Sequence, residues 1–486
     1  MAIKKSSGVT FTEKLLGELC ENTFLKVWAY PNLYKSDGKE LCDVLAIFEN
    51  HVFLFFDRES KKFENTDIDI LLQWSRWEKE VIQKQIITAE GAKRYISSFP
   101  DKIYLDQKRE VRFPIPIPSN VIVHKIIVAH GAEQACKNFS SNNIYGSLAI
   151  GYTGSKATQN SFPFMVHLEK NDPVHIFDSH NLKIILGELD TVFDFTEFIK
   201  AKEEAIKKYD CIYYCGEEDL LAHYFLNYDD LTNRYCIGTK DKSANAIFIG
   251  EGEWQNFSKS KAYKLRKEAN EKSYFWDRLL QVTCKNALED TLRGNGNIFN
   301  AQSAIHEMAK EPRFSRRTLS GVMIDAIKKF PEDIPGLVRN LSYMPSFYEG
   351  VAYVFLQIKH PNIVDYENEY RPRKQRLLEI ACGVAKNRFP QLNKIIGIGI
   401  DAPKFSHKNS EDFILLNCEN WTEEEATLFE DENKGFNFFD QNKMVKQFIS
   451  NSDFPTQKNS IGNKSVARNA NCPCGSGKKY KRCCGL

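Results

Sequence analysis

The sequence has no hydrophobic run long enough to span a bilayer and no apolar leader at its start. A membrane-spanning helix needs about 18 to 20 consecutive apolar residues, and a secretory leader places an apolar segment directly after a basic start. The chain begins Met-Ala-Ile-Lys-Lys-Ser-Ser-Gly and passes at once into an amphipathic pattern. We therefore expect a cytoplasmic protein without a membrane segment. Its 486 residues, 42% hydrophobic and 27% charged, leave room for two or three globular domains.

Over most of its length the sequence also lacks the cysteine pattern of a disulfide-rich secreted protein. Nine of the thirteen cysteines are scattered through apolar or mixed surroundings. We expect buried thiols at positions 20, 42, 136, 211, 215, 236, 284, 382 and 418. Cys211 and Cys215 are a close pair, but the intervening Ile-Tyr-Tyr is typical of a strand and no second pair stands nearby, which argues against a metal site there.

The other four cysteines crowd into the last fifteen residues. Cys472, Cys474, Cys483 and Cys484 form two tight pairs on either side of a stretch that contains Gly-Ser-Gly. Four thiolates are the usual ligands of a closed structural zinc site, which leaves no open position for catalysis. A segment this short and polar needs the ion in order to fold. The alternative, a redox-active cysteine tail, does not explain why all four thiols gather here.

The pattern Cys-x-Cys, Ser-Gly, Cys-Cys over residues 470–486 resembles the SEC-C motif, the zinc-binding element at the C-terminal end of the SecA translocase ATPase. The resemblance implies a small zinc knuckle that docks a protein or ribosomal partner and is attached to many unrelated bacterial proteins. It covers the zinc element alone and does not make the chain a translocase motor. A Walker-type phosphate loop is excluded at Gly475–Lys478, because Cys472 replaces the first glycine and Lys479 stands where the hydroxyl should be.

The net charge is +2, but its distribution is uneven. Residues 456–486 carry seven lysines and arginines and no acid, whereas the rest of the chain carries 59 basic and 64 acidic residues. Residues 456–470 are rich in Asn, Ser and Lys, and we expect a flexible basic linker there. Such an arm either stays solvated or is attracted to phosphate backbones and acidic partners, and both readings remain open.

At the N-terminus, the spacing of apolar residues predicts a helix over 11–27, with Glu18 on it. Two strand patterns follow at 41–48 and 52–57, separated by Glu49-Asn50-His51, which predicts a β-hairpin. A turn centred on Asn50 would set Asp43 opposite Asp57. Alternation along the returning strand would then place Asp57, Glu59 and Lys61 on one face.

This order, a helix with Glu18, a strand with Asp43 and a return through Asp-x-Glu-x-Lys, resembles the PD-(D/E)xK core of restriction-endonuclease-like nucleases over about residues 11–100. The resemblance implies that carboxylates of Asp43, Asp57 and Glu59 hold Mg²⁺ or Mn²⁺. It further implies that Lys61 orients the attacking water or stabilises developing charge on the phosphate, and that Glu18 or Glu21 supplies another acid.

An alternative register changes this interpretation. If the returning strand continues through residue 58, Arg58 takes the lysine position and Phe56 stands where the acid belongs. That variant would be an inactive site. The sequence leaves both registers open.

The middle region, 111–455, alternates strand and helix patterns typical of an α/β or α+β fold. We expect strands at 121–129, 148–152, 174–177, 212–214 and 394–400, helices at 182–186, 195–207 and 220–225, and a mainly helical stretch at 254–355. Before this region, residues 63–96 should be helical, with Trp74 and Trp77 three apart in the core rather than stacked on bases.

Several polar residues of the middle region have structural interpretations. Asp178–His180 are too close in sequence for Ser-His-Asp triad geometry, and no nucleophile-elbow motif is present. Asp219 stands just before an apolar helix pattern and is expected to cap it. Three arginines could contact phosphates, but salt bridges are favoured because acids are equally abundant nearby: Arg313, Arg316 and Arg317.

Taken together, the sequence predicts a mixed α/β protein of bacterial type with four parts. These are a restriction-endonuclease-like domain at 1–110, an uncharacterised α/β region at 111–455, the basic linker at 456–470 and the SEC-C zinc-binding motif at 471–486. The leading function is metal-dependent nuclease or nucleic-acid-associated protein, with structural Zn²⁺ and with Mg²⁺ or Mn²⁺ at the N-terminal site. The alternative is a non-enzymatic adaptor whose zinc knuckle docks a protein or ribosomal partner.

Overall fold

The computed structural model describes residues 5–64, 68–140, 145–154, 162–241, 243–288, 298–331, 333–360, 363–402, 411–440, 442, 444–446, 449 and 452–455. The protein has a mixed α/β architecture with several separate sheets. The four cysteines of the C-terminal motif and the linker before them lie outside the described residues. The nine cysteines that are described are free thiols. Six of them are buried, as predicted, whereas Cys211, Cys215 and Cys236 are only partly buried.

The N-terminal segment folds as a helix followed by a three-stranded antiparallel meander. Helix α1 (Phe11–Phe24) begins at a capping box in which Thr10 and Glu13 bond each other's backbone amides. Strands β1 (Ala29–Lys35), β2 (Glu40–Phe48) and β3 (His51–Glu59) follow. The predicted helix and hairpin are therefore confirmed.

The same sheet continues with parallel strands. After β3 the chain forms α2 (Ile70–Trp77), the π-helical η1 (Glu78–Gln83), α3 (Lys84–Ser98) and β4 (Ile103–Tyr104). Strand β5 (Ile122–His130) then pairs in parallel with β3, and β8 (Val174–Asp178) pairs in parallel with β5. The order is β4-β1-β2-β3-β5-β8, so residue 110 falls within the part of the sequence that builds this sheet.

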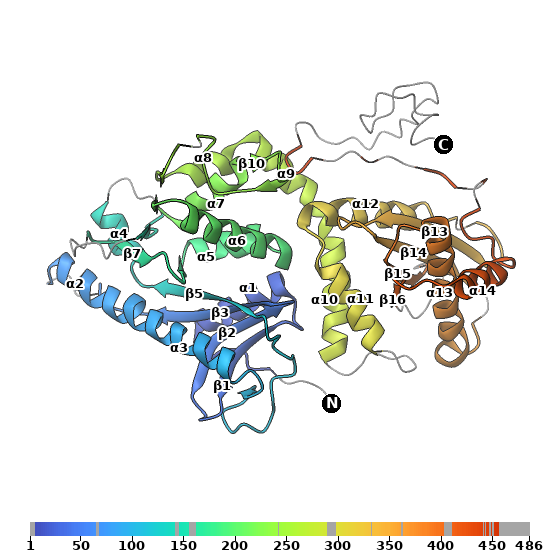
Figure 1. Ribbon diagram of the computed structural model, residues 1–486, viewed down its shortest axis with the longest axis horizontal. Coiled ribbons are helices and arrows are strands. Elements are labelled where there is room, and N and C mark those ends of the chain that lie inside the picture. Colours follow the sequence, from blue (N-terminus) through green and yellow to red (C-terminus); the bar gives the residue numbers. More distant parts are fainter. Residues whose placement is uncertain are drawn as a thin grey trace.

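Helices cover both faces of this sheet (Figure 1). On one face, Phe24 of α1 packs on Phe53 and Phe55, together with Phe195 of α6 (Val192–Lys208). The α2–α3 segment covers the other face, where both tryptophans of α2 have no exposed surface. Trp74 and Trp77 are therefore core residues, as predicted.

A second sheet has four strands in the order β12-β9-β6-β7. Its strands are β6 (Ala149–Thr153), β7 (Met165–Glu169), β9 (Cys211–Tyr214) and β12 (Ala246–Ile249). Helices α4 (Glu133–Phe139), α5 (Asn181–Glu188) and α7 (Glu217–Leu226) accompany it, with the short hairpin β10 (Tyr228–Asp229) and β11 (Arg234–Tyr235). A buried ion pair between Lys202 and Glu217, at 2.7 Å, joins α6 to α7.

The expected role of Asp219 is wrong in one respect. Gly216 is the N-cap of α7, and Asp219 lies inside its first turn. The Asp219 carboxylate instead accepts the backbone N–H groups of Gly252 and Trp254, at 3.2 and 2.7 Å. It therefore caps the start of another helix, α8 (Glu253–Lys259), because the fold brings that helix beside α7.

A group of helices follows: α9 (Lys261–Asn270), the 3₁₀ turn η2 (Glu271–Ser273), α10 (Tyr274–Leu288), α11 (Ile298–Ala309) and α12 (Arg313–Lys328). The three arginines that begin α12 are buried. Arg313 bonds Asp190 and Asp277, Arg316 bonds Asp277 and Arg317 bonds Asp453, at 2.5 to 2.8 Å. The prediction of salt bridges rather than phosphate contacts is confirmed.

The last sheet has the order β13-β14-β15-β16. Its strands are β13 (Val338–Pro345), β14 (Val351–Lys359), β15 (Lys394–Asp401) and β16 (Asp412–Asn417), with η3 (Tyr366–Tyr370), α13 (Arg371–Arg388) and α14 (Glu423–Asn433). The expectation of helix through residue 355 is wrong beyond α12. The run that forms β14 is apolar from Val351 to Leu356 because it is a central, buried strand, a pattern that periodicity cannot tell from a buried helix.

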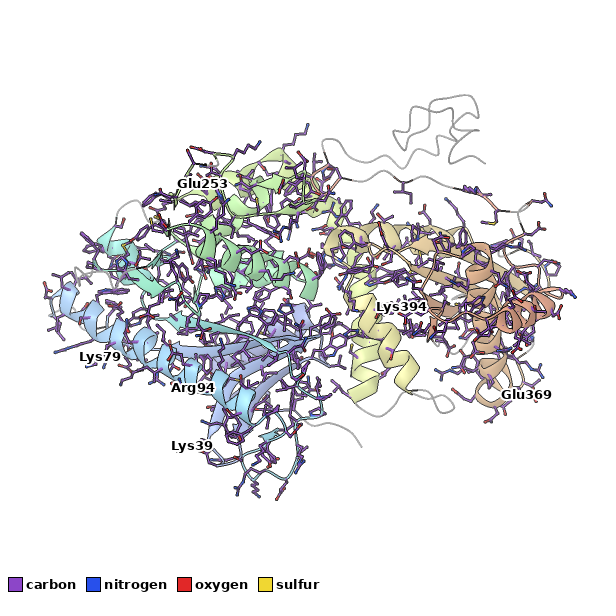
Figure 2. The ribbon with its side chains drawn as sticks, viewed as in Figure 1. Lys39, Lys79, Arg94, Glu253, Glu369 and Lys394 are labelled. Atoms are coloured by element: carbon purple, nitrogen blue, oxygen red, sulfur yellow. The ribbon has the colours of Figure 1, made fainter. Side chains whose placement is uncertain are left out.

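Helix α11 connects the two halves of the molecule (Figure 1). His306 stacks on Phe48 at a ring separation of 4.7 Å, and Glu307 bonds Lys394 of β15 at 2.9 Å. Figure 2 labels Lys394 at this junction. Among the described residues, no helix is long and apolar enough to cross a membrane.

Candidate functional site

The predicted catalytic residues lie around the open end of the β2–β3 hairpin, but the register differs from the expected one. The ladder pairs Phe48 with His51 and Val44 with Phe55, so its continuation sets Asp43 opposite Phe56. The expected pairing of Asp43 with Asp57 is wrong by one residue. The hairpin closes through two residues rather than around Asn50, with Glu49 at a positive φ of 53°, and a one-residue change of register exchanges the two faces of a strand.

Asp43 is nevertheless in contact with Asp57. Its Oδ2 accepts the backbone N–H of Asp57 at 2.7 Å. Burial raises the pKa of Asp43 to about 8; the hydrogen bond from Asp57 opposes this rise, and the nearby acids Glu40, Glu13 and Asp57 add to it. The acid from α1 that influences Asp43 is thus Glu13, whose carboxylate also accepts the backbone N–H of Val9 at 2.6 Å.

Asp57 takes part in a hydrogen-bond chain across three strands. One of its carboxylate oxygens accepts the Thr12 hydroxyl at 2.5 Å, and the other is 2.6 Å from Nε2 of His130. The second ring nitrogen of His130, Nδ1, lies 2.6 Å from Oγ of Ser179. Burial lowers the pKa of His130, but the hydrogen bond and charge of Asp57 outweigh it and raise the pKa above its usual value.

This chain brings Asp57, His130 and Ser179 together from β3, from the end of β5 and from the turn after β8. Sequence reasoning missed it because 73 and 49 positions separate the bonded residues. When a carboxylate orients an imidazole toward a hydroxyl, the imidazole can accept or donate a proton. It can also activate a serine hydroxyl as a nucleophile.

Acyl transfer needs a further feature, a set of amides that stabilises an oxyanion. The nearest turn amides, those of His180 and Asn181, both donate to Oδ1 of Asp178 at 2.9 Å. They are therefore committed to holding the turn together. Asp178 thus has a structural role here, and the geometry favours proton relay over acyl transfer.

The other predicted residues lie farther out. Glu59 and Lys61 line an open hollow, together with Ser60, Gln73, Gly131 and Gln134. Lys61 is exposed and pairs with Glu64 at 3.3 Å. Glu18 is exposed on α1. The structure thus brings Asp43 and Asp57 together and places Glu59 and Lys61 at the rim of a neighbouring hollow.

Strand β3 runs through Glu59, as the alternative register required. Phe56 is buried, and Arg58 lies 3.6 Å from Glu80 of η1. On the face that the ladder assigns to Asp43, the next positions of β3 are therefore an apolar residue and an arginine. The classical acid-x-lysine pair is not found at these positions.

The two carboxyl groups that remain are of the ligand type that divalent cations prefer. Asp43 and Asp57 offer hard oxygen donors, and Asp43 has further acids around it. Each carboxylate has about four acceptor positions, so the bonds to Thr12 and His130 leave Asp57 able to bind further. Asp43 and Asp57 are thus the residues that would hold Mg²⁺ or Mn²⁺.

Comparisons with known proteins match the C-terminal end. Residues 468–486 match the model of the SEC-C motif. Protein translocase subunit SecA of Caldicellulosiruptor saccharolyticus is 51% identical over 45 residues, and that of Geotalea uraniireducens is 46% identical over 46 residues. SecA of Trichlorobacter lovleyi is 49% identical over 43 residues.

These matches are short. They cover 9 or 10% of this chain and 5% of each SecA. The chain therefore carries a SEC-C motif at its C-terminus, a zinc-binding type of element, on a body that the SecA matches do not include. No solved structure matches this chain.

Proposed function

We propose that the protein is a cytoplasmic, zinc-dependent docking protein whose C-terminal SEC-C element recruits a protein or ribosomal partner. The match of residues 468–486 to the SEC-C motif carries this proposal. In it, Cys472, Cys474, Cys483 and Cys484 hold one structural Zn²⁺ with no open ligand position.

The modular distribution of the motif supports a docking role. The chain shares a short C-terminal segment with SecA proteins, covering 5% of the first of them. An element that occurs on otherwise different proteins is explained most simply by a shared binding partner. The basic residues 456–470 would give the element reach and attract it to acidic or phosphate-bearing surfaces.

The test compares the full-length chain with the double variant Cys483→Ser/Cys484→Ser in affinity capture from a bacterial lysate, with ribosomes purified in parallel. We expect wild type to bind zinc and to retain the partner, and the variant to lose both. A matched control, Cys211→Ser/Cys215→Ser, changes the other close pair of cysteines and should retain both. Equal capture by all three proteins would contradict the proposal.

A second candidate function concerns the N-terminal domain, which we propose to be a restriction-endonuclease-like nuclease that cleaves phosphodiester bonds with a divalent metal. Because β3 has Phe56 and Arg58 at the positions of the acid and the lysine, the register expected of an inactive site, this candidate requires Asp43 and Asp57 to take the place of that pair. The specific observation is the element order: α1, the β1–β2–β3 meander, the α2–α3 segment and then β5 parallel to β3, with Asp43 on β2. Burial and, to a smaller extent, the neighbouring acids raise the pKa of Asp43 to about 8, and a bound cation would offset the repulsion between these acids.

In this candidate function, a bound Mg²⁺ or Mn²⁺ would polarise the phosphate and lower the pKa of a bound water. The chain's own residues prepare the site. The backbone amide of Asp57 fixes the Asp43 carboxylate, and Thr12 and His130 fix that of Asp57. His130 and Ser179 form a path that can take a proton away from the site.

Incubation of the protein with single- and double-stranded DNA and RNA, in Mg²⁺ or Mn²⁺, tests this candidate. We expect cleavage by wild type and its loss in Asp43→Asn. The exposed Asp37→Asn is the matched control and should remain active. No cleavage by wild type, or equal cleavage by Asp43→Asn, would contradict the candidate and leave the docking role alone.

A further inference from the structure

Two histidines and a glutamate meet at the other end of the parallel strands. His124 lies near the start of β5, His175 near the start of β8, and Glu203 on α6. One possible ligand atom from each lies within 4.8 Å of the others, and this is the single group of three such residues that the described ranges contain. Oε1 of Glu203 is 2.8 Å from Nδ1 of His124 and 3.3 Å from Nε2 of His175.

One of these separations, 3.3 Å, equals the spacing of neighbouring ligands around zinc, and the other, 2.8 Å, is shorter and would lengthen on binding. Zinc bonds of about 2.0 to 2.1 Å to nitrogen and oxygen place neighbouring ligands of a tetrahedron about 3.3 Å apart. The three side chains come from three elements and converge without change of the backbone. We propose that His124, His175 and Glu203 form a binding site for one first-row transition-metal ion of the zinc class, separate from the C-terminal cysteines.

The ligand types decide the class of ion. Two imidazoles and one carboxylate suit zinc and its first-row neighbours, whereas Mg²⁺ and Ca²⁺ prefer oxygen ligands alone. The same combination of ligands is typical of zinc sites that keep a position for water or substrate. The site therefore differs in kind from the four-thiolate site proposed for the C-terminus.

Both histidines are shielded from solvent. His124 is 1% exposed and His175 is fully buried. The Glu203 side chain is 18% exposed, which gives an ion a route from solvent.

Neighbouring groups support the three ligands. Nδ1 of His51, at the start of β3, lies 2.9 Å from Nε2 of His124 and fixes the orientation of that ring. The nearby cations are already paired, because Lys202 bonds Glu217 at 2.7 Å and Lys200 bonds Glu197 at 2.6 Å.

The site is distinct from the one around Asp57. Six residues of β5 separate His124 from His130, which corresponds to about 20 Å along the strand. An ion bound at His124 would instead link α6 to the edge of the sheet where β5 and β8 begin. The inference is independent of both proposed functions, because neither uses these residues.

The competing explanation is a hydrogen-bond network without metal, in which Glu203 accepts from both histidines. Zinc stoichiometry separates the two. We would saturate the purified full-length protein with Zn²⁺, remove excess by gel filtration and measure zinc per chain by mass spectrometry. We expect two zinc ions in wild type and one in Cys483→Ser/Cys484→Ser, where the cysteine site is destroyed.

Adding Glu203→Gln to that double variant should remove the remaining ion. Adding the matched Glu204→Gln, on the next residue of α6, should leave it in place. Glutamine still accepts hydrogen bonds from both histidines, so the fold is expected to survive, and circular dichroism checks this. If the cysteine variant holds no zinc, or if Glu203→Gln retains it, the proposal is wrong.

Cobalt gives a second readout. Co²⁺ added to Cys483→Ser/Cys484→Ser should produce visible d–d bands without the thiolate charge-transfer band that cysteine ligands give. His175→Asn should abolish these bands. Bands of equal intensity in His175→Asn and in its parent would overturn the assignment of the ligands.

Discussion

The two ends of strand β5 carry polar clusters of opposite character. At its start, His124 and His175 surround a single carboxylate, that of Glu203, and burial keeps His175 neutral. At its C-terminal end, a single histidine, His130, lies beside the carboxylate of Asp57 and has a raised pKa. The contact of imidazole with carboxylate raises the histidine pKa at both ends, but the net shift is downward for His175 and upward for His130.

The difference shows what decides the charge of a buried histidine. Burial lowers the pKa at both ends. At the start of β5, the cation Lys202 and the neighbouring ring of His124 add to that effect. At the finish, Asp57 reverses it, and the acids Glu133 and Glu59 contribute further. One end thus favours a neutral histidine and the other a protonated one.

The largest expected effect comes from breaking the first cluster with Glu203→Leu in metal-free protein. The change leaves two buried imidazole N–H donors without an acceptor, and we expect a loss of about 2 to 4 kcal/mol in unfolding free energy. Urea denaturation in EDTA measures it. The control Glu204→Leu removes an exposed pair with Arg234 and should cost less than about 1 kcal/mol. Equal losses would show that the cluster has no special role.

The next largest effect on stability is expected at the C-terminal end of β5. Asp57→Asn removes the charge that raises the His130 pKa, so that burial prevails and the pKa falls. We expect a loss of about 1.5 to 3 kcal/mol, typical of a charge-assisted hydrogen bond. Because the folded pKa of His130 is raised, this loss should be fully present below about pH 6.5 and shrink as pH rises through the folded pKa. NMR titration of His130 checks the direction; an unchanged pKa would contradict it.

The pH dependence of stability tests the raised pKa of Asp43. Its pKa is raised from 3.8 to about 8, so the folded state keeps a proton that the unfolded state releases, and stability falls as pH rises from about 4 to 8. Asp43→Asn cannot ionise and should escape this fall. Relative to wild type it should gain at least about 1.4 kcal/mol, one pKa unit, between pH 5 and pH 8. Parallel pH profiles of the melting temperature would refute the raised pKa.

The smallest effect is expected at the rim of the hollow. Glu59→Gln and Lys61→Ala change exposed side chains, and we expect stability to remain within about 0.5 kcal/mol of wild type. In the nuclease assay these variants test the sequence-based catalytic set directly. Activity that depends on Asp43 but not on Glu59 or Lys61 would assign the site to the aspartates alone.

Local patterns were sufficient for many elements. The helix that contains Glu18 and the hairpin that follows were predicted because apolar spacing distinguishes the two periods over long, regular segments. The buried arginines of α12 were also anticipated, since the abundance of acids nearby predicted salt bridges. The strand at the end of the 254–355 stretch was not predicted, because a strand buried on both faces has no alternation of apolar and polar residues to detect.

The geometry of the candidate sites depended on strand register and on contacts between distant segments. The turn at Glu49 and Asn50 shifted the hairpin by one residue, and this placed Phe56 rather than Asp57 opposite Asp43. The sequence pattern allowed either register, since both kept apolar residues in the core. No local pattern linked His130 to Asp57 or to Ser179, because sequence patterns relate only residues that are near one another in the chain.

The sequence alone determined the C-terminal SEC-C motif and the first helix and hairpin, because each depends on residues near one another in the chain. The tertiary structure decided which ends of β3, β5 and β8 meet. Parallel strands joined by long crossovers bring together residues from distant segments, and so the chain Asp57–His130–Ser179 and the group His124–His175–Glu203 exist only in the folded protein.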